Sequence, residues 1–244
     1  MNVFSIVRIH GPLDLKNVRR DDLLAWIALL PLALALVVRL ATVPLTELLR
    51  RELGFDLAPY YPLLMSFVAV MAPSMAGMVI GFLLLDERDD QVLTALMVTP
   101  TPLAGYLTYR ILLPLALGWL ITLVVYPLAG LAELKWIDLF AVAGLAACNG
   151  PVTALFLAAF AENKLTGFAL VKILNSINMV PVLAYFAPGA WQLLAGVVPA
   201  FWPMKMLWLA AAGQSYFLYG LAGVVVNAAA ILLLLRRFDT VLHR

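Results

Sequence analysis

The densest group of acidic residues in the 244-residue chain lies between residues 86 and 100, in the stretch DERDDQVLTALMVTP. Asp86 and Asp90 form a D-x-x-x-D pattern, and carboxylates at this spacing can hold Mg²⁺ together with the pyrophosphate of a prenyl substrate. Enzymes with that chemistry carry a second acidic motif, whereas the remaining acidic residues here are scattered. A lipid-modifying enzyme is therefore the weaker alternative for the function of this stretch.

Residue types that support other catalytic chemistry are sparse. His10 and His243 lie near the two ends of the chain. This position excludes an intramembrane serine protease, which needs a Ser–His pair within its membrane spans. Cys148 is the single cysteine, which excludes an internal disulfide and a zinc site built from cysteines. None of the 15 glycines precedes a lysine, so the phosphate-binding loop of ATPases is absent. We therefore expect no catalytic residues, no metal site and no cofactor in this chain.

The composition requires most of the chain to lie in lipid. Apolar residues make up 64% of the chain and charged residues 12%, and the mean hydropathy is +1.00. Soluble domains have about 45–50% apolar residues and about 25% charged residues. The net charge of +2 is too small to indicate nucleic-acid binding. Because charged residues are costly at the membrane centre, the stretches between them mark the spans. Six transmembrane helices are predicted, at residues 23–44, 60–85, 107–130, 138–160, 168–187 and 216–235.

Two stretches of low charge are not predicted to cross the membrane. Residues 91–109 contain a Thr-Pro-Thr-Pro sequence, which ends or starts a helix more readily than it spans a bilayer. The segment 188–215 follows span five and is interrupted by several prolines and a glycine. We predict that it forms an outer re-entrant segment, since irregular backbone at that depth is tolerated only where protein or water covers it.

The lysines and arginines predict the orientation of the chain. Eleven fall on the side of the two termini and five on the other, which by the positive-inside tendency places both termini in the cytoplasm. The first set is Arg8, Lys16, Arg19, Arg20, Arg88, Arg110, Lys164, Lys172, Arg236, Arg237 and Arg244, and the second is Arg39, Arg50, Arg51, Lys135 and Lys205. The first 22 residues are too polar for a cleaved signal peptide. We expect a multi-pass protein of the cell membrane.

Residues 86–100 have the pattern of a short amphipathic helix in the cytoplasmic loop between spans two and three. Four acidic residues stand at its predicted start, where they would favour the positive end of the helix dipole. Apolar residues follow at helical spacing, and Thr99-Pro100 ends the helix. Such a helix is either a solvated loop helix or a surface that docks on another protein, and the residues alone leave both open.

The stretch 86–100 resembles the first cytoplasmic loop of the type-2 ABC exporter permeases (ABC-2 family), which often has the sequence E-R-E-E-G-T-L-E-Q-L-L-V-T-P. The matching positions are Glu87, Arg88, Asp89, Asp90, Leu93, Leu96, Val98, Thr99 and Pro100. The family's Gly-Thr is replaced by Gln91-Val92, which predicts a more continuous helix. The segments PAFWPMKMLW (199–208) and AENKLTGFAL (161–170) are similar to those of small bacterial drug-export permeases of this type.

The resemblance implies an all-α integral membrane fold, with residues 1–244 forming a single permease domain. It implies an N-terminal amphipathic connecting helix (1–22), six spans, a cytoplasmic coupling helix (86–100) and the outer re-entrant segment (188–215). In that family the coupling helix inserts into a groove of a separate ABC ATPase subunit. Its implied contacts with the ATPase are Glu87, Arg88, Asp89 and Asp90, while Leu93 and Leu96 brace the helix against the bundle and Thr99 and Pro100 end it.

The resemblance further implies a transport subunit that has no ATPase site of its own. ATP and Mg²⁺ would be bound by the partner ATPase, and a second copy or a related permease would complete a dimer. The implied activity is outward movement of a hydrophobic or amphipathic substrate, a drug or a lipid. A non-transporting membrane scaffold is an alternative, whereas ion-coupled transport is disfavoured because no acidic residue falls inside the core of a predicted span.

Two sets of residues predict contacts inside the membrane. Span five carries a polar stripe with spacings i, i+3, i+4 and i+7, which predicts a translocation path, a permease interface or hydrogen bonds between helices. The stripe consists of Lys172, Asn175, Ser176 and Met179, with Asn178 nearby. In span two, Gly77 and Gly81 predict close helix packing, within the bundle or between permeases.

Overall fold

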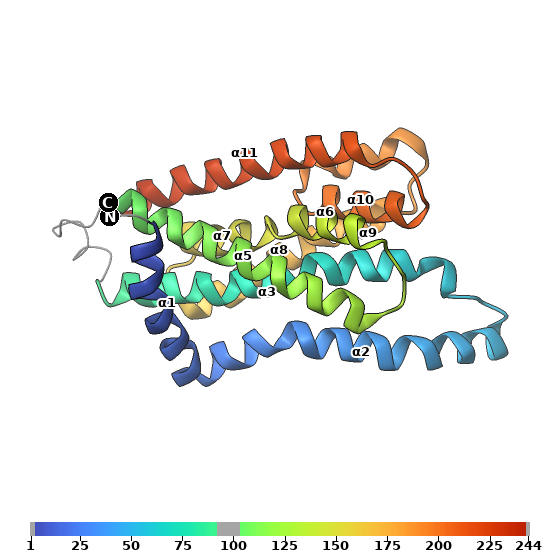
Figure 1. Ribbon diagram of the computed structural model, residues 1–244, viewed down its shortest axis with the longest axis horizontal. Helices are drawn as coiled ribbons and strands as arrows, with labels where there is room; N and C mark the ends of the chain where they lie inside the picture. Colours follow the sequence, from blue (N-terminus) through green and yellow to red (C-terminus); the bar gives the residue numbers. More distant parts are fainter. Residues whose placement is uncertain (1–2, 92–102, 243–244) are drawn as a thin grey trace.

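The computed structural model describes residues 3–91 and 103–242, and every regular element in this part of the chain is a helix (Figure 1). Six of the described segments are long and apolar enough to cross a membrane, which confirms the predicted all-α integral membrane fold. They comprise α2 (Asp22–Leu53), η1 with α3 (Ala58–Tyr60 and Tyr61–Asp89), α5 (Leu103–Ala129), α6 with α7 (Trp136–Ala146 and Asn149–Phe160), α8 with α9 (Lys164–Asn178 and Val180–Ala184), and α11 (Phe217–Leu242).

Helix α3 forms the centre of the bundle. In the most apolar 18-residue stretch of each span, the buried share is 94% for α3, 22% for α2 and 11% for α11. Helix α3 is therefore enclosed by other helices, while α2 and α11 lie at the periphery. The close packing predicted for Gly77 and Gly81 is confirmed, and it lies within the bundle against α7. A Cβ atom added to Gly77 would lie 2.1 Å from the carbonyl oxygen of Gly150, and one added to Gly81 would lie 2.8 Å from the Leu157 side chain.

The first span is longer than predicted. The span was predicted to end at residue 44, but α2 continues to Leu53. Its start is fixed by Asp21, whose carboxylate accepts hydrogen bonds from the backbone N–H groups of Leu23 and Leu24 at 3.0 and 3.2 Å. Its end is fixed by Gly54, which adopts a left-handed conformation (φ 66°). The end of α2 therefore depends on a glycine cap rather than on where the charges begin.

The segment 188–215 folds back into the bundle after the fifth span. It contains η2 (Gly189–Val197) and α10 (Phe201–Ala211), and α10 packs against α3, α6 and α11 at the end away from the termini (Figure 1). Phe201, Met204 and Leu207 are fully buried, and the indole of Trp208 donates a hydrogen bond to the Ser66 hydroxyl at 2.8 Å. Helix α10 is therefore packed into the bundle, and whether segment 188–215 re-enters the membrane stays a prediction.

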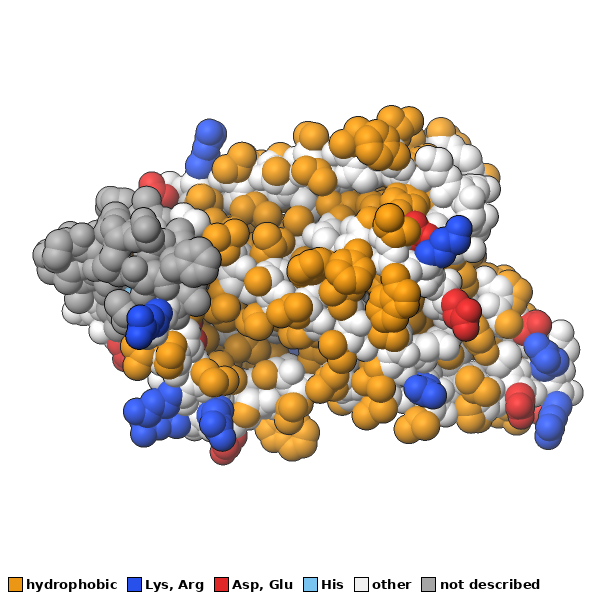
Figure 2. All heavy atoms as spheres, in the orientation of Figure 1, with side chains coloured by type: hydrophobic (Ala, Val, Ile, Leu, Met, Phe, Trp, Pro, Cys, Tyr) orange, Lys and Arg blue, Asp and Glu red, His pale blue; other side chains and the backbone are white. Residues whose placement is uncertain are grey.

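Helix α1 (Val3–Arg20) crosses the end of the bundle where both termini lie (Figure 1). Two termini at one end are what an even number of spans requires. Hydrophobic side chains cover the middle of the molecule, while charged side chains gather toward the two ends (Figure 2). The surface is therefore divided as expected for a protein that exposes its middle to lipid and its ends to water.

Candidate functional site at the base of the first loop

The acidic residues between spans two and three do not begin a new helix, and this part of the prediction is wrong. Helix α3 continues to Asp89, so Asp86, Glu87 and Asp89 lie in its last turn, followed by a turn in which Gln91 has a φ of 57°. Acids at a helix C-terminus are opposed by the helix dipole and need compensating cations. The predicted coupling residues Leu93, Leu96, Thr99 and Pro100 lie outside the described residues.

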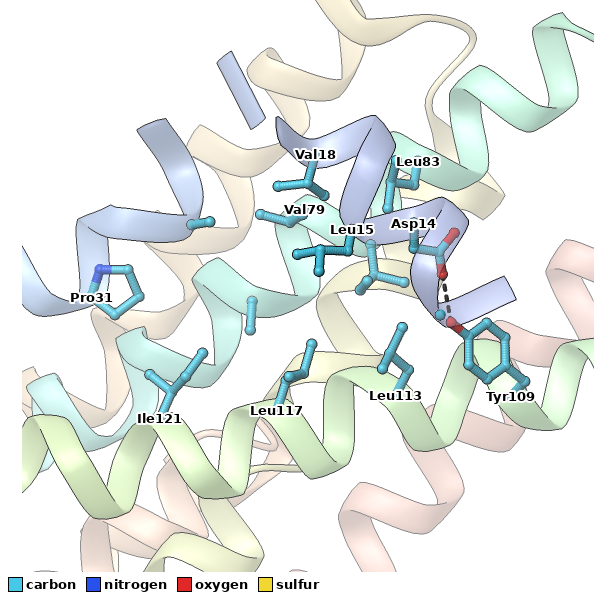
Figure 3. Close-up of a pocket in the computed structure, with 14 residues that line it drawn as sticks. Asp14, Leu15, Val18, Pro31, Val79, Leu83, Tyr109, Leu113, Leu117 and Ile121 are labelled. Carbon is cyan, nitrogen blue, oxygen red and sulfur yellow. Dashed lines mark hydrogen bonds between the residues drawn. The ribbon is translucent and has the colours of Figure 1, made fainter. Parts of the chain in front are cut away.

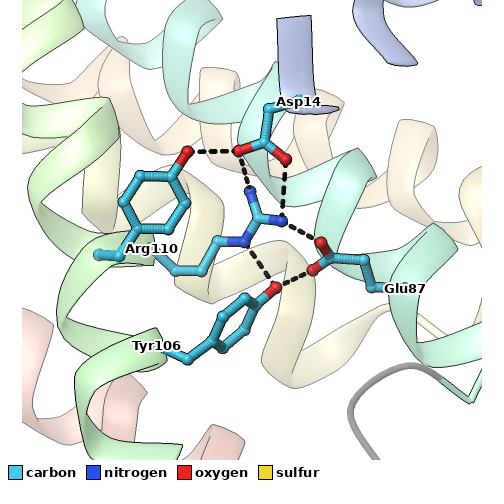
Figure 4. Close-up of polar contacts among 5 residues, drawn as sticks. Asp14, Glu87, Tyr106 and Arg110 are labelled. Carbon is cyan, nitrogen blue, oxygen red and sulfur yellow. Dashed lines mark hydrogen bonds and ion pairs between the residues drawn. The ribbon is translucent and has the colours of Figure 1, made fainter. Parts of the chain in front are cut away.

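Arg110 supplies the first compensating charge, from the start of α5 (Figure 4). Its guanidinium makes a bidentate contact with Asp14 on α1, at 2.9 and 3.1 Å. It also forms an ion pair with Glu87 on α3 and donates from Nε to the hydroxyl of Tyr106 at 2.7 Å. The Tyr106 hydroxyl donates in turn to Glu87, and the Tyr109 hydroxyl donates to Asp14 at 2.6 Å. We call these five residues the Arg110 network.

The Arg110 network is buried. The side chain of Arg110 is 1% exposed, that of Asp14 is 9% exposed and that of Glu87 is 15% exposed. Buried charges are tolerated when they are paired and hydrogen-bonded, and here every donor nitrogen of the guanidinium group has a partner. Glu87 was predicted to contact an ATPase, and the structure directs its carboxylate into the chain. The network joins both sides of the first loop to α1, because α3 precedes the loop and α5 follows it.

A second group of contacts ties the end of α3 to the turn between α7 and α8. The Lys164 ammonium lies 2.7 Å from Asp21 and 3.0 Å from Asp86. The hydrogen bond from Lys164 lowers the pKa of Asp21 below its usual value. Arg88 donates to the carbonyl oxygens of Ala161 and Glu162, both at 2.7 Å, directly after the end of α7. Arg88 is therefore also engaged inside the chain.

Asp89 and Asp90 are the described coupling residues whose side chains are exposed at the end of α3. His10 of α1 lies beside the network, with its ring centroid 5.4 Å from that of Tyr106 and 6.1 Å from that of Tyr109. Burial, together with the positive charge of Arg110, lowers the pKa of His10, so the imidazole is neutral at physiological pH. Among the described coupling residues, the acidic side chains of Asp89 and Asp90 thus remain at the surface.

The polar stripe of span five lies on the uncovered side of α8. Lys172, Asn175 and Ser176 are exposed, as is Met179 just after the helix, while Asn178 is buried on the other side. The Ser176 hydroxyl donates to the carbonyl oxygen of Lys172 at 2.9 Å, so its hydrogen bond is made within the helix. The structure therefore brings four of the five predicted residues onto one outward face and separates Asn178 from them.

Sequence reasoning missed four members of the Arg110 network. Arg110 was used only as a positive-inside charge, and Asp14, Tyr106 and Tyr109 were given no role. The spacing Tyr106, Tyr109, Arg110 places the three polar side chains on adjoining positions of one helix, directly after the first loop. That spacing, in a helix start whose other residues are apolar or glycine apart from Thr108, was the available signal.

Comparison with known proteins agrees with the predicted resemblance to bacterial drug-export permeases. The family model described as "Fluoroquinolones export permease protein Rv2686c-like" matches residues 14–235. Two relatives from Mycobacterium tuberculosis are the fluoroquinolones export permease proteins Rv2686c (strain ATCC 25618 / H37Rv) and MT2760 (strain CDC 1551 / Oshkosh). Each is 35% identical over 231 residues, covering 93% of this chain and 92% of the relative. No solved structure matches the chain significantly. This multi-pass membrane protein therefore belongs to the Rv2686c-like family of fluoroquinolone export permeases.

Proposed function

We propose that this chain is the membrane subunit of a type-2 ABC exporter, which moves a hydrophobic or amphipathic drug out of the cell. The names of the relatives favour a fluoroquinolone as the substrate. In this proposal, a separate ATPase binds ATP and Mg²⁺ and docks at the end of the bundle that carries α1, the first loop and both termini. That end faces the cytoplasm, as the excess of lysines and arginines there favours.

The observation that carries the proposal is the way the first loop is fastened at both of its ends. Glu87 on the α3 side and Tyr106 with Arg110 on the α5 side are joined directly, and Asp14 adds α1 to the same cluster. A force applied to the loop by an ATPase would then move the ends of α3, α5 and α1 together. Because α3 is the buried central helix, its displacement would also shift the helices packed around it.

Reversing the charges at Asp89 and Asp90 is expected to remove the ATPase from the complex. The double variant Asp89→Lys, Asp90→Lys alters exposed side chains outside the Arg110 network, so the fold should be retained. We expect ATPase recovered with the tagged permease from mildly solubilised native membranes to fall about tenfold or more, since like charges are then opposed across the interface. Recovery is measured by mass spectrometry of the captured proteins.

The matched control reverses two exposed acids at the other end of the bundle, Glu52→Lys and Glu133→Lys. This variant carries the same change in net charge and should recover as much ATPase as the wild type. Equal recovery with both variants would place the ATPase contact elsewhere. If the wild type captured no ATPase, the result would contradict the exporter proposal and favour the membrane scaffold or the lipid-modifying enzyme instead.

A second copy of the chain, or a related permease, is proposed to cover the uncovered face of α8. Lys172 and Asn175 are exposed on a helix that is otherwise apolar enough to cross the membrane. Polar side chains facing lipid are costly, whereas the same groups facing a partner helix or a water-filled path are not. The exposed stripe therefore favours a permease dimer with α8 at or beside the translocation path.

Cysteine cross-linking tests this arrangement in membranes. In a Cys148→Ala background, Ser176→Cys is expected to give a disulfide-linked dimer after mild oxidation, because the outward face of α8 would meet its counterpart. Val225→Cys on α11, which is 68% exposed in the single chain, serves as the control and should stay monomeric. Bands on a non-reducing gel are compared. A dimer formed only through Val225→Cys would assign the interface to α11 instead.

A further inference from the structure

An apolar cleft of about 320 Å³ lies between α1, α2, α3 and α5 (Figure 3). Its lining includes two polar side chains, Asp14 and Tyr109, and these are hydrogen-bonded to each other. Both oxygens of Asp14 also contact Arg110. The cleft therefore offers hydrocarbon contacts to a ligand and no unpaired carboxylate. A polar solute would lose its hydration there without gaining hydrogen bonds in return.

The cleft continues along α5 toward the middle of the bundle. Leu113, Leu117 and Ile121 follow one another at intervals of four residues along its wall, and they project toward α2 and α3 (Figure 3). A second hollow of about 270 Å³ shares Ala28, Pro31 and Ile121 with the first and extends it to Val124. From Leu113 to Val124 the helix rises about 16 Å. The space is thus elongated along a membrane-spanning helix, in the direction in which acyl chains lie.

The mouth of the cleft opens on the outer surface of the bundle. Ala28 and Leu32 of α2 and Leu120 and Val124 of α5, which border the second hollow, are exposed. This surface belongs to the apolar band over the middle of the molecule (Figure 2). A chain from the surrounding lipid can therefore enter sideways, without crossing water or displacing a helix.

One edge of α1 combines cleft-lining residues with positive charge. Arg8, Gly11, Leu15 and Arg19 are spaced by three, four and four residues, so they form a single stripe along the helix. Gly11 and Leu15 line the cleft, whereas Arg8 and Arg19 are exposed at either side of them. Lys16 and Arg20 are exposed on the adjoining face of α1. Guanidinium groups bind phosphate through paired hydrogen bonds.

We propose that this cleft binds an acyl chain of an anionic phospholipid, with the negatively charged headgroup lying beside the basic edge of α1. The chain would run along α5 from Leu113 toward Val124, beneath the Asp14–Tyr109 hydrogen bond. The negative headgroup complements the charges of Arg8 and Arg19, which a zwitterionic lipid would satisfy less well. The proposal does not depend on the ATPase, so it can fail while the transport proposal stands.

Lipid retention by the purified full-length protein tests this site. After delipidation in mild detergent, the protein is incubated with dioleoyl phosphatidylglycerol or dioleoyl phosphatidylcholine, and bound lipid is counted by native mass spectrometry. The wild type should retain phosphatidylglycerol more strongly. The variant Arg8→Gln, Arg19→Gln should lower that retention by about fivefold for each charge removed. Equal retention of the two lipids by the wild type would overturn the headgroup assignment.

The matched pair Gly11→Leu and Gly144→Leu tests the acyl-chain site itself. A Cβ atom on either glycine meets nothing within 4 Å, and both substitutions add a leucine to a helix. The leucine at position 11 would occupy the cleft and should displace phosphatidylglycerol, whereas the leucine at position 144 lies on α6 and should not. Unchanged retention in the Gly11→Leu protein would show that the chain does not lie in this cleft.

Discussion

Replacing Arg110 with leucine is expected to be the most damaging single change at the site. It leaves Asp14 and Glu87 buried beside each other without a cation, and removing one partner of a buried ion pair costs about 3–5 kcal/mol. We expect a clear fall in the thermal unfolding temperature of the detergent-solubilised protein and loss of drug export from cells. Arg236→Leu, at an exposed arginine of α11, is the control and should change neither.

A triple variant separates the stability of the Arg110 network from its function. Replacing the charged groups together, as Asp14→Leu, Glu87→Leu and Arg110→Met, removes the unpaired charges, and such swaps are often neutral or stabilising. If the network only stabilises the fold, this protein should both fold and export. If it transmits movement from the first loop to α1, the protein should fold but export poorly. Export and stability that are both normal in Arg110→Leu would contradict any role for the network.

The positions of the spans could be predicted because lipid imposes a rule that is local in sequence. Charges and stretch lengths located the six helical segments that are long and apolar enough to cross a membrane. The exact ends of the helices could not be predicted as accurately. The end of α2 at Gly54 depends on a left-handed glycine cap, and the continuation of α3 to Asp89 depends on cations from elsewhere in the chain.

Only part of the candidate site could be predicted from the sequence. The acidic run drew attention to the end of α3, where Glu87 joins the Arg110 network and Asp86 meets Lys164. Its partners could not be inferred, since Arg110 meets Asp14 across 96 residues of sequence and Lys164 meets Asp21 across 143. Only the packing of α1 across the end of the bundle brings them together. As a result, Glu87 was predicted to contact an ATPase, although its carboxylate is directed toward Arg110.

Exchanging Gly77 for alanine is expected to destabilise the bundle, although alanine is the better helix former. The added methyl would lie 2.1 Å from the carbonyl oxygen of Gly150 and 2.8 Å from its carbonyl carbon. Both are backbone atoms of α7, so no side chain can rotate away and the helices must separate. Overpacking of this kind costs about 1–3 kcal/mol or more, which outweighs the gain of up to about 1 kcal/mol from helix propensity.

The same exchange at Gly144 should have the opposite sign. A Cβ atom there meets nothing within 4 Å, so Gly144→Ala keeps only the propensity gain and should raise the unfolding temperature slightly. Gly81→Ala should fall between the two, because its nearest neighbour is the flexible Leu157 side chain rather than backbone. Thermal unfolding of the Gly77 and Gly81 variants therefore ranks two contacts of α3 with α7, and Gly144 on α6 serves as the uncrowded reference. A Gly77→Ala protein as stable as the wild type would show that α3 and α7 are not held this closely.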